Sequence, residues 1–153
     1  MLKRTLIMAA ALIPLVFSVS NTAEAHCQVP CGIYDDAARF TALREDVTTI
    51  EKATNEIAKL AGKTDAQSAN QLVRWVTTKE EHATRIIEVI STYFLTQKIK
   101  PVTADDKAYT GYIQKLNTAH LVMRAAMKAK QTVSPDSIKG LSDAISAFEK
   151  AMK

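Results

Sequence analysis

Three residues whose side chains bind metals stand close together near the start of the chain: His26, Cys27 and Cys31. Thiolate sulfur favours soft or borderline metals, and amine or imidazole nitrogen combined with sulfur suits a tetragonal site. Cleavage of the chain before His26 would add its free α-amine as a further donor, next to the backbone amide of Cys27. This set of donors favours nickel or copper.

The residues around Cys31 are those of a tight turn. Pro30 restricts the backbone between the two sulfurs, and a proline in such a turn is sometimes cis. Gly32 permits the sharp turn that follows. Tyr34 can then fold over the open side of a metal, where its hydroxyl can order a small ligand or water. We therefore predict a closed metal-binding hook over residues 26–34. Without metal, Cys27 and Cys31 could instead form a disulfide, and the sequence leaves this open.

The first 25 residues resemble a secretory signal peptide. Lys3 and Arg4 precede an apolar run over residues 6–17, and Ala23-Glu24-Ala25 fits a small-x-small cleavage site. Signal peptidase would then expose His26 as the new N-terminus. We expect residues 1–25 to be removed and the mature chain, residues 26–153, to be periplasmic or secreted rather than cytoplasmic. No later segment is long and apolar enough to span a membrane.

Four amphipathic helices are predicted to carry the hook. They cover residues 36–61, about 69–97, a segment capped by Thr103, and a segment that begins at Ser134-Pro135. The expected core faces are Phe40, Leu43, Val47, Ile50 and Ile57; Ala69, Leu72, Val76, Ala83, Ile86, Ile90 and Tyr93; Ile113, Leu116, His120, Met123 and Met127; and Ile138, Leu141, Ile145, Phe148 and Met152. Short connections between such helices predict an all-α fold, an antiparallel four-helix bundle with an N-terminal hook.

Several other classes of protein fit the sequence poorly. The formal charge of +4 is spread along the chain without a basic run, so a nucleic-acid surface is not supported. Di-iron bundles need Glu three residues before His, but Lys79 precedes His82 and Asn117 precedes His120 at that spacing. A c-type haem needs Cys-x-x-Cys-His, which the chain lacks.

The segment His26-Cys27-Gln28-Val29-Pro30-Cys31-Gly32-Ile33-Tyr34 resembles the nickel hook of the nickel superoxide dismutase family, in which H-C-x-x-P-C-G-x-Y precedes a four-helix bundle. The resemblance implies one nickel ion per subunit, bound by the α-amine and imidazole of His26, the amide and thiolate of Cys27, and the thiolate of Cys31. Tyr34 would line a pocket for a small anion.

The resemblance also implies an activity and an assembly. It implies conversion of superoxide to dioxygen and hydrogen peroxide by Ni(II)/Ni(III) cycling, in a homohexamer. The alternative is a non-enzymatic secreted bundle that binds nickel or copper with the same terminus.

The sequence departs from one branch of the family near the metal. Gln28 replaces an acidic residue, and Thr41 or Ala42 and His82 stand where that branch has a glutamate and an arginine that orient the axial imidazole. We expect His82 to be an exposed helix residue, with a contact near the hook as the alternative. His120, on an apolar stripe, is expected in the core or at an interface.

Overall fold

The structure, a computed structural model, describes residues 28–153, so the predicted leader, His26 and Cys27 lie outside the described residues. Within this range the chain forms helices and turns and no strands. The helices are α1 (Asp36–Leu60), α2 (Ala66–Glu88), the π-helix η1 (Val89–Lys98), α3 (Tyr109–Gln131) and α4 (Pro135–Met152).

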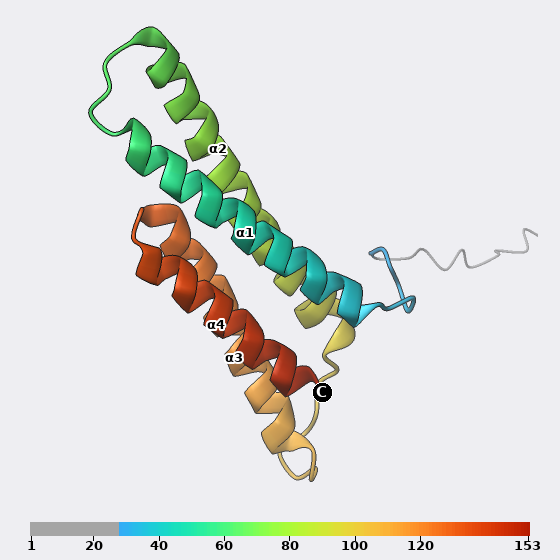
Figure 1. The fold of residues 1–153 in the computed structure, drawn as a ribbon. Helices are drawn as coiled ribbons and strands as arrows, with labels where there is room; N and C mark the ends of the chain where they lie inside the picture. The colour runs from blue at the N-terminus through green and yellow to red at the C-terminus, as the bar shows by residue number, and fades with distance from the viewer. Residues whose placement is uncertain (1–27) are drawn as a thin grey trace, which may run out of the picture.

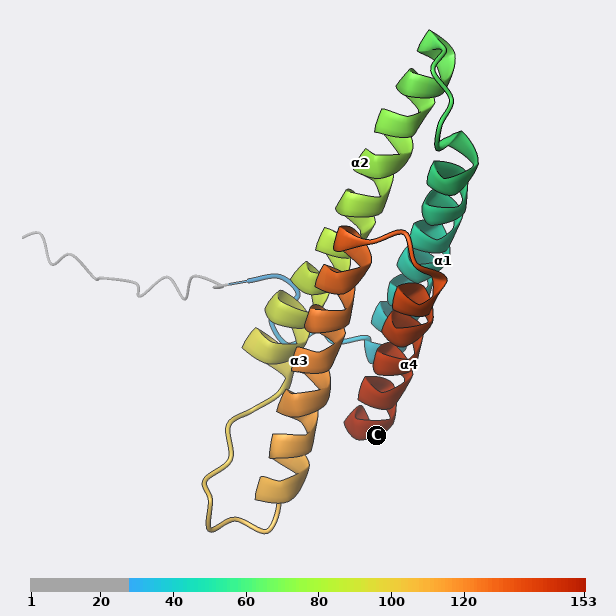
Figure 2. The ribbon, with the colours of Figure 1, turned by 90° about the vertical axis from the view of Figure 1, so that its left-hand side faces the viewer.

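The helices form two antiparallel hairpins that lie side by side, α1 with α2 and α3 with α4 (Figures 1 and 2). Because α2 also contacts α3 and α1 contacts α4, the four helices surround one core. The predicted all-α antiparallel four-helix bundle is therefore confirmed. In the described range no helix is both long and apolar enough to cross a membrane.

Short local signals explain where the helices begin and end. Asp35 caps α1 by accepting a hydrogen bond from the Ala38 amide at 2.9 Å, and Asp65 caps α2 in the same way. Gly62 adopts a positive φ of 81° just beyond α1, a conformation that glycine reaches without strain. Pro135 occupies the first turn of α4, as its sequence predicts.

A cluster of three phenylalanines joins the helices close to the hook. Phe94 of η1 lies 5.1 Å from Phe40 of α1 and 4.9 Å from Phe148 of α4, measured between ring centroids. All three rings are buried. Burial of such rings contributes much of the stability of a core, so η1 is held firmly against both α1 and α4.

The predicted second helix is wrong in its last third. Residues 69–97 are not one α-helix, because the chain changes at Val89 into the π-helix η1. Val76, expected in the core, is 40% exposed, since the α1–α2 hairpin extends past the α3–α4 connection (Figure 1). The core face of α2 proper is formed by Ala83 and Ile86.

The predicted third helix is wrong in its start and in part of its buried face, of which Leu116 and Met123 do pack against the core. Thr103 accepts a hydrogen bond from the Asp106 amide in a turn, and α3 begins only at Tyr109. Its fully buried residues are small: Ala119, Val122, Ala126 and Ala129. Alanines allow α3 to approach its neighbours closely, and the larger Ile113, Met127 and His120 remain on the exposed side in the single chain.

The C-terminal end of α3 is closed by a buried lysine of α2. The Lys79 Nζ donates to the carbonyl oxygens of Ala129, Lys130 and Thr132 at 3.2, 2.8 and 2.9 Å. These carbonyls have no partner inside their own helix, and the helix dipole makes this end favourable for a cation. The contact ties α2 to α3 at the end of the bundle where α3 turns into α4.

Candidate metal centre

The described part of the hook is a tight turn in front of α1. The Val29–Pro30 peptide bond is cis, and the Ile33 amide donates to the Pro30 carbonyl at 3.0 Å. Cys31 and Gly32 have positive φ angles of 39° and 93°. Glycine adopts such angles without steric cost, which explains its place directly after Cys31. The turn leaves Cys31 exposed at its tip.

One side chain of η1 holds this turn against the bundle. The Gln97 Oε1 accepts a hydrogen bond from the Cys31 amide at 3.1 Å, and its Nε2 donates to the Val29 carbonyl at 3.3 Å. The same Nε2 donates to the Thr92 carbonyl at 2.9 Å within η1. Gln97 is only 6% exposed. The prediction from sequence missed this residue, although it stands one helical turn after Tyr93 on the apolar side of the second helix.

Tyr34 lies beside the same part of η1. Its hydroxyl donates to the Gln97 main-chain carbonyl at 3.1 Å, and its ring meets the Tyr93 ring edge-on at 5.6 Å between centroids. The Lys98 Nζ lies 5.0 Å from the centre of the Tyr34 ring, a cation–π contact. Since the hydroxyl hydrogen is used by Gln97, the oxygen of Tyr34 remains able to accept a hydrogen bond from water.

Tyr93 and Lys98 both bind the first carboxylate of α1. The Tyr93 hydroxyl donates to Asp36 Oδ1 at 2.8 Å, and the Lys98 Nζ lies 3.1 Å from Asp36 Oδ2. Burial of the phenol, together with its hydrogen bond to the charged Asp36, raises the pKa of Tyr93 to about 12. Tyr93 is therefore neutral at physiological pH and acts as a hydrogen-bond donor.

The structure brings two of the four predicted site residues together at one place. Cys31 and Tyr34 both bond to Gln97, one to its side chain and the other to its backbone. His26 and Cys27 lie outside the described residues. Among residues 28–153, no group of three or more His, Cys, Asp or Glu side chains could hold a metal ion.

Comparison with known proteins decides the family. A family model described as nickel-containing superoxide dismutase matches residues 21–153. The chain belongs to this family. No curated protein and no solved structure matched the chain. It is therefore an oxidoreductase that uses nickel to convert superoxide to dioxygen and hydrogen peroxide, and the non-enzymatic alternative is set aside.

The residues of this superoxide dismutase fit a nickel ion by the chemistry of their donors. Cys31 presents a sulfur on a turn that is fixed to the bundle, a few residues after His26 and Cys27 in the chain. Nickel accepts such a mixture of sulfur and nitrogen donors. The carboxylate nearest to Cys31 along the chain, Asp35, is used elsewhere, because it caps α1 by accepting a hydrogen bond from the Ala38 amide.

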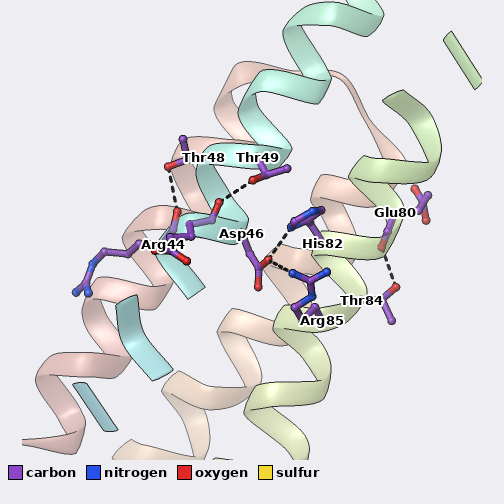
Figure 3. Close-up of polar contacts among 9 residues, drawn as sticks. Arg44, Asp46, Thr48, Thr49, Glu80, His82, Thr84 and Arg85 are labelled. Carbon is purple, nitrogen blue, oxygen red and sulfur yellow. Dashed lines mark hydrogen bonds and ion pairs between the residues drawn. The ribbon is translucent and has the colours of Figure 1, made fainter. Parts of the chain in front are cut away.

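A second polar cluster lies between α1 and α2 of the enzyme (Figure 3). The carboxylate of Asp46, which is 3% exposed, is 2.6 Å from His82 Nδ1 and accepts a hydrogen bond from Arg85 at 3.2 Å. His82 is thus partly buried, and the prediction of an exposed helix residue is wrong. Its partner is the Asp46 carboxylate from α1. His82, at which the sequence departs from one branch of the family, therefore belongs to a polar cluster between α1 and α2.

The enzyme also has a surface hollow of about 610 Å³ between α1 and α4. Arg44, Thr54 and Asn55 of α1 and Asp136 and Asp143 of α4 contribute to its lining. None of the predicted site residues lines this hollow. This hollow therefore does not coincide with the hook.

Proposed function

We propose that the enzyme binds nickel through His26, Cys27 and Cys31 after cleavage behind Ala25. The observation that carries this proposal is the attachment of Cys31 to Gln97, because it gives one thiolate a defined position at the start of the bundle. A metal ligand needs such support, since coordination geometry depends on the surrounding hydrogen bonds. Before cleavage the α-amine of His26 does not exist, so maturation by signal peptidase completes the site.

Each ligand has a distinct chemical role in this proposal. The thiolates of Cys27 and Cys31 and the deprotonated amide of Cys27 are strong anionic donors that stabilise a higher oxidation state. The imidazole of His26 would add a neutral nitrogen donor. When bound, nickel supplies the exchange of one electron with each superoxide in turn. Two superoxide ions and two protons thereby yield one dioxygen and one hydrogen peroxide.

Tyr34 binds and orients the small molecules in this site. Its hydroxyl hydrogen is committed to the Gln97 carbonyl, so its oxygen accepts a hydrogen bond from a water molecule. That water can in turn donate to superoxide and pass on the proton that peroxide formation requires. Tyr34 is thereby a binding group that holds a proton donor in place.

The hook carries apolar side chains that favour contact with another subunit. Val29 and Ile33 are 86% and 83% exposed in the single chain. Exposed apolar residues next to a functional segment favour a protein interface, because their burial is favourable. We propose that this surface is covered in a homohexamer. We also propose that the mature enzyme is periplasmic or secreted, because residues 1–25 have the basic start, apolar run and small-x-small end of a secretory leader.

Native mass spectrometry tests these proposals in one measurement. The full chain, expressed with its own leader in cells supplied with nickel, should yield a hexamer of chains that begin at His26, each with one nickel. Cell fractionation of the same culture should find it outside the cytoplasm. Chains that begin elsewhere and still bind nickel, or chains from His26 that carry a Cys27–Cys31 disulfide and no metal, would contradict the proposed ligand set.

A further inference from the structure

We propose that Gln97 is a positioning residue that sets the place of the Cys31 thiolate at the nickel site. This inference rests on the ligand set proposed above, and it adds a residue that lies far from the hook in the sequence. Gln97 reaches the hook from η1 and contacts it at three points: the Cys31 amide, the Val29 carbonyl and the Tyr34 hydroxyl.

The hydrogen bonds of the Gln97 side chain leave it little freedom to move. Both functions of its amide are used, because Oε1 accepts from the Cys31 amide and Nε2 donates to the carbonyls of Val29 and Thr92. The side chain is buried at 6% exposure. A buried amide that loses these partners is costly, so the bonds hold the side chain and the hook in one arrangement. The turn cannot shift without breaking them.

The position of Cys31 depends on this support from outside the hook. Within residues 28–34 the main chain has a single hydrogen bond between its own groups, from the Ile33 amide to the Pro30 carbonyl. Such a short turn has little rigidity of its own. Fixing the amide of Cys31 limits its sulfur to the few positions that side-chain rotation allows. A neutral amide does this without adding a charge beside the thiolates.

The π-helix supplies the geometry that turns Gln97 toward the hook. Within η1, hydrogen bonds run back five residues, as from the Ile99 amide to the Phe94 carbonyl at 2.8 Å. The Gln97 carbonyl stands in the last turn, where carbonyls lack partners inside the helix, and it accepts from Tyr34 instead. Short π-helical segments occur often at functional sites. Here the segment presents both the side chain and the carbonyl of one residue to the hook.

The test is the variant Gln97→Met, produced as full-length protein in nickel-supplied cells. Methionine has a similar length and fills the space, but it cannot form the hydrogen bonds of the amide side chain to Cys31, Val29 and Thr92. The bond from the Tyr34 hydroxyl to the main-chain carbonyl remains. The matched control is Thr96→Val, because the exposed Thr96 hydroxyl donates within η1, to the Ser91 carbonyl at 2.7 Å. Two measurements are made: the rate at which a chelator removes nickel, and the electron paramagnetic resonance spectrum of the oxidised centre, which reports donor geometry.

In Gln97→Met we expect nickel to be lost roughly 10- to 100-fold faster, the range typical for removal of a residue that supports a metal ligand. The resonance spectrum should shift or broaden, and kcat/KM per bound nickel should fall by a similar factor. Thr96→Val should match the wild type. An unchanged spectrum and loss rate in Gln97→Met, or equal changes in both variants, would overturn the inference.

A further variant covers the case in which Gln97→Met does not fold. Gln97→Glu keeps the acceptor for the Cys31 amide and loses the donor to Val29, so it should lie between the wild type and a full loss of positioning. A wild-type spectrum and loss rate in Gln97→Glu would then overturn the inference. If the wild type itself carries no nickel at the hook, the proposed ligand set is wrong. If the wild type carries nickel and the Gln97 variants behave like it, only the role of Gln97 is wrong.

Discussion

Two polar networks in the same bundle solve different problems. The network at the hook consists of Gln97, Tyr34, Tyr93, Asp36 and Lys98. Four of its hydrogen bonds involve a main-chain atom. The network between α1 and α2 consists of Asp46, His82 and Arg85 and connects side chains alone.

The difference follows from what each network must hold. Regular helices satisfy their own backbones, so the Asp46 cluster needs only to join two side-chain faces and set how α1 and α2 lie against each other. In the described part of the hook, residues 28–34, the main chain forms one hydrogen bond between its own groups, and Gln97 binds its peptide atoms directly. We infer that the first network serves the chemistry and the second serves the scaffold.

The largest effect should come from Cys31→Ser, which changes the hook and leaves the Asp46 cluster intact. A serine hydroxyl is a poor replacement for a thiolate donor. We expect nickel content to drop below a tenth of an ion per subunit and superoxide turnover to fall more than about 100-fold. The measurement is metal analysis with stopped-flow decay of superoxide. Turnover close to wild type in a well-folded Cys31→Ser protein would remove Cys31 from the ligand set.

The reverse variant, Asp46→Asn, should lower stability and spare the chemistry. It removes a buried charge that is 2.6 Å from His82 and 3.2 Å from Arg85. We expect a loss of about 2 kcal/mol in the free energy of unfolding, below the usual cost for a buried pair because Arg85 can return to water. Urea unfolding of metal-free protein at a fixed concentration measures it, with Thr49→Val as control.

The activity of Asp46→Asn per bound nickel decides between the two roles. It should equal that of the wild type if the cluster serves only the scaffold. A loss of activity per nickel with unchanged stability would instead show that Asp46 and His82 influence the metal centre. The sequence offered this as the alternative for His82, a contact near the hook.

Much of the fold could be predicted from the sequence because its signals are local. The helix α1 was expected over residues 36–61 and spans Asp36–Leu60, and the start of α4 at Pro135 was expected from its cap. The face of α3 was predicted only in part, through Leu116 and Met123. Large apolar residues dominate the hydrophobic periodicity of a sequence, whereas the fully buried residues of α3 are three alanines and one valine.

The support of the hook was harder to predict than the hook itself. The types and spacing of residues 26–34 indicate a metal site directly, since few segments combine such donors. Gln97 carries no such signal on its own, because its role depends on a π-helix formed by tertiary packing. The only available sign was a glutamine four residues after Tyr93, on the stripe that faces the core.

Tyr93→Phe should have a smaller effect and a distinctive dependence on pH. Loss of the hydroxyl that donates to Asp36 should cost about 1 kcal/mol of stability near neutral pH. The pKa of Tyr93 is raised to about 12 in the folded enzyme, above its ordinary value of about 10. Between these values the unfolded chain loses the proton and the folded chain keeps it, so rising pH favours unfolding.

The wild type should therefore lose part of its stability between about pH 10 and 12, and Tyr93→Phe should lose less. Urea unfolding at several pH values across this window measures the difference, and the two curves should approach each other as the pH rises. Tyr109→Phe, at the start of α3, is the control and should follow the wild type. Parallel curves for wild type and Tyr93→Phe would contradict the raised pKa.

Lys98→Gln should have the smallest effect, on the approach of the substrate. Lys98 lies against the Tyr34 ring and, with Lys100, Lys107 and Lys115, lines a hollow of about 500 Å³. Superoxide is an anion, and a group of cations beside its site raises its local concentration. We expect kcat/KM to fall about twofold at low ionic strength and to reach the wild-type value as salt screens the charges.

The control for this variant is Lys139→Gln, which removes an exposed lysine of α4 paired with Asp143. It changes the net charge equally and should leave kcat/KM within experimental error. A twofold loss in Lys98→Gln that persists at high salt would have a different meaning. Lys98 would then act through its contacts with Tyr34 and Asp36, by keeping the hook network in place. In that case its effect on activity would come from positioning the hook, and not from electrostatic attraction of superoxide.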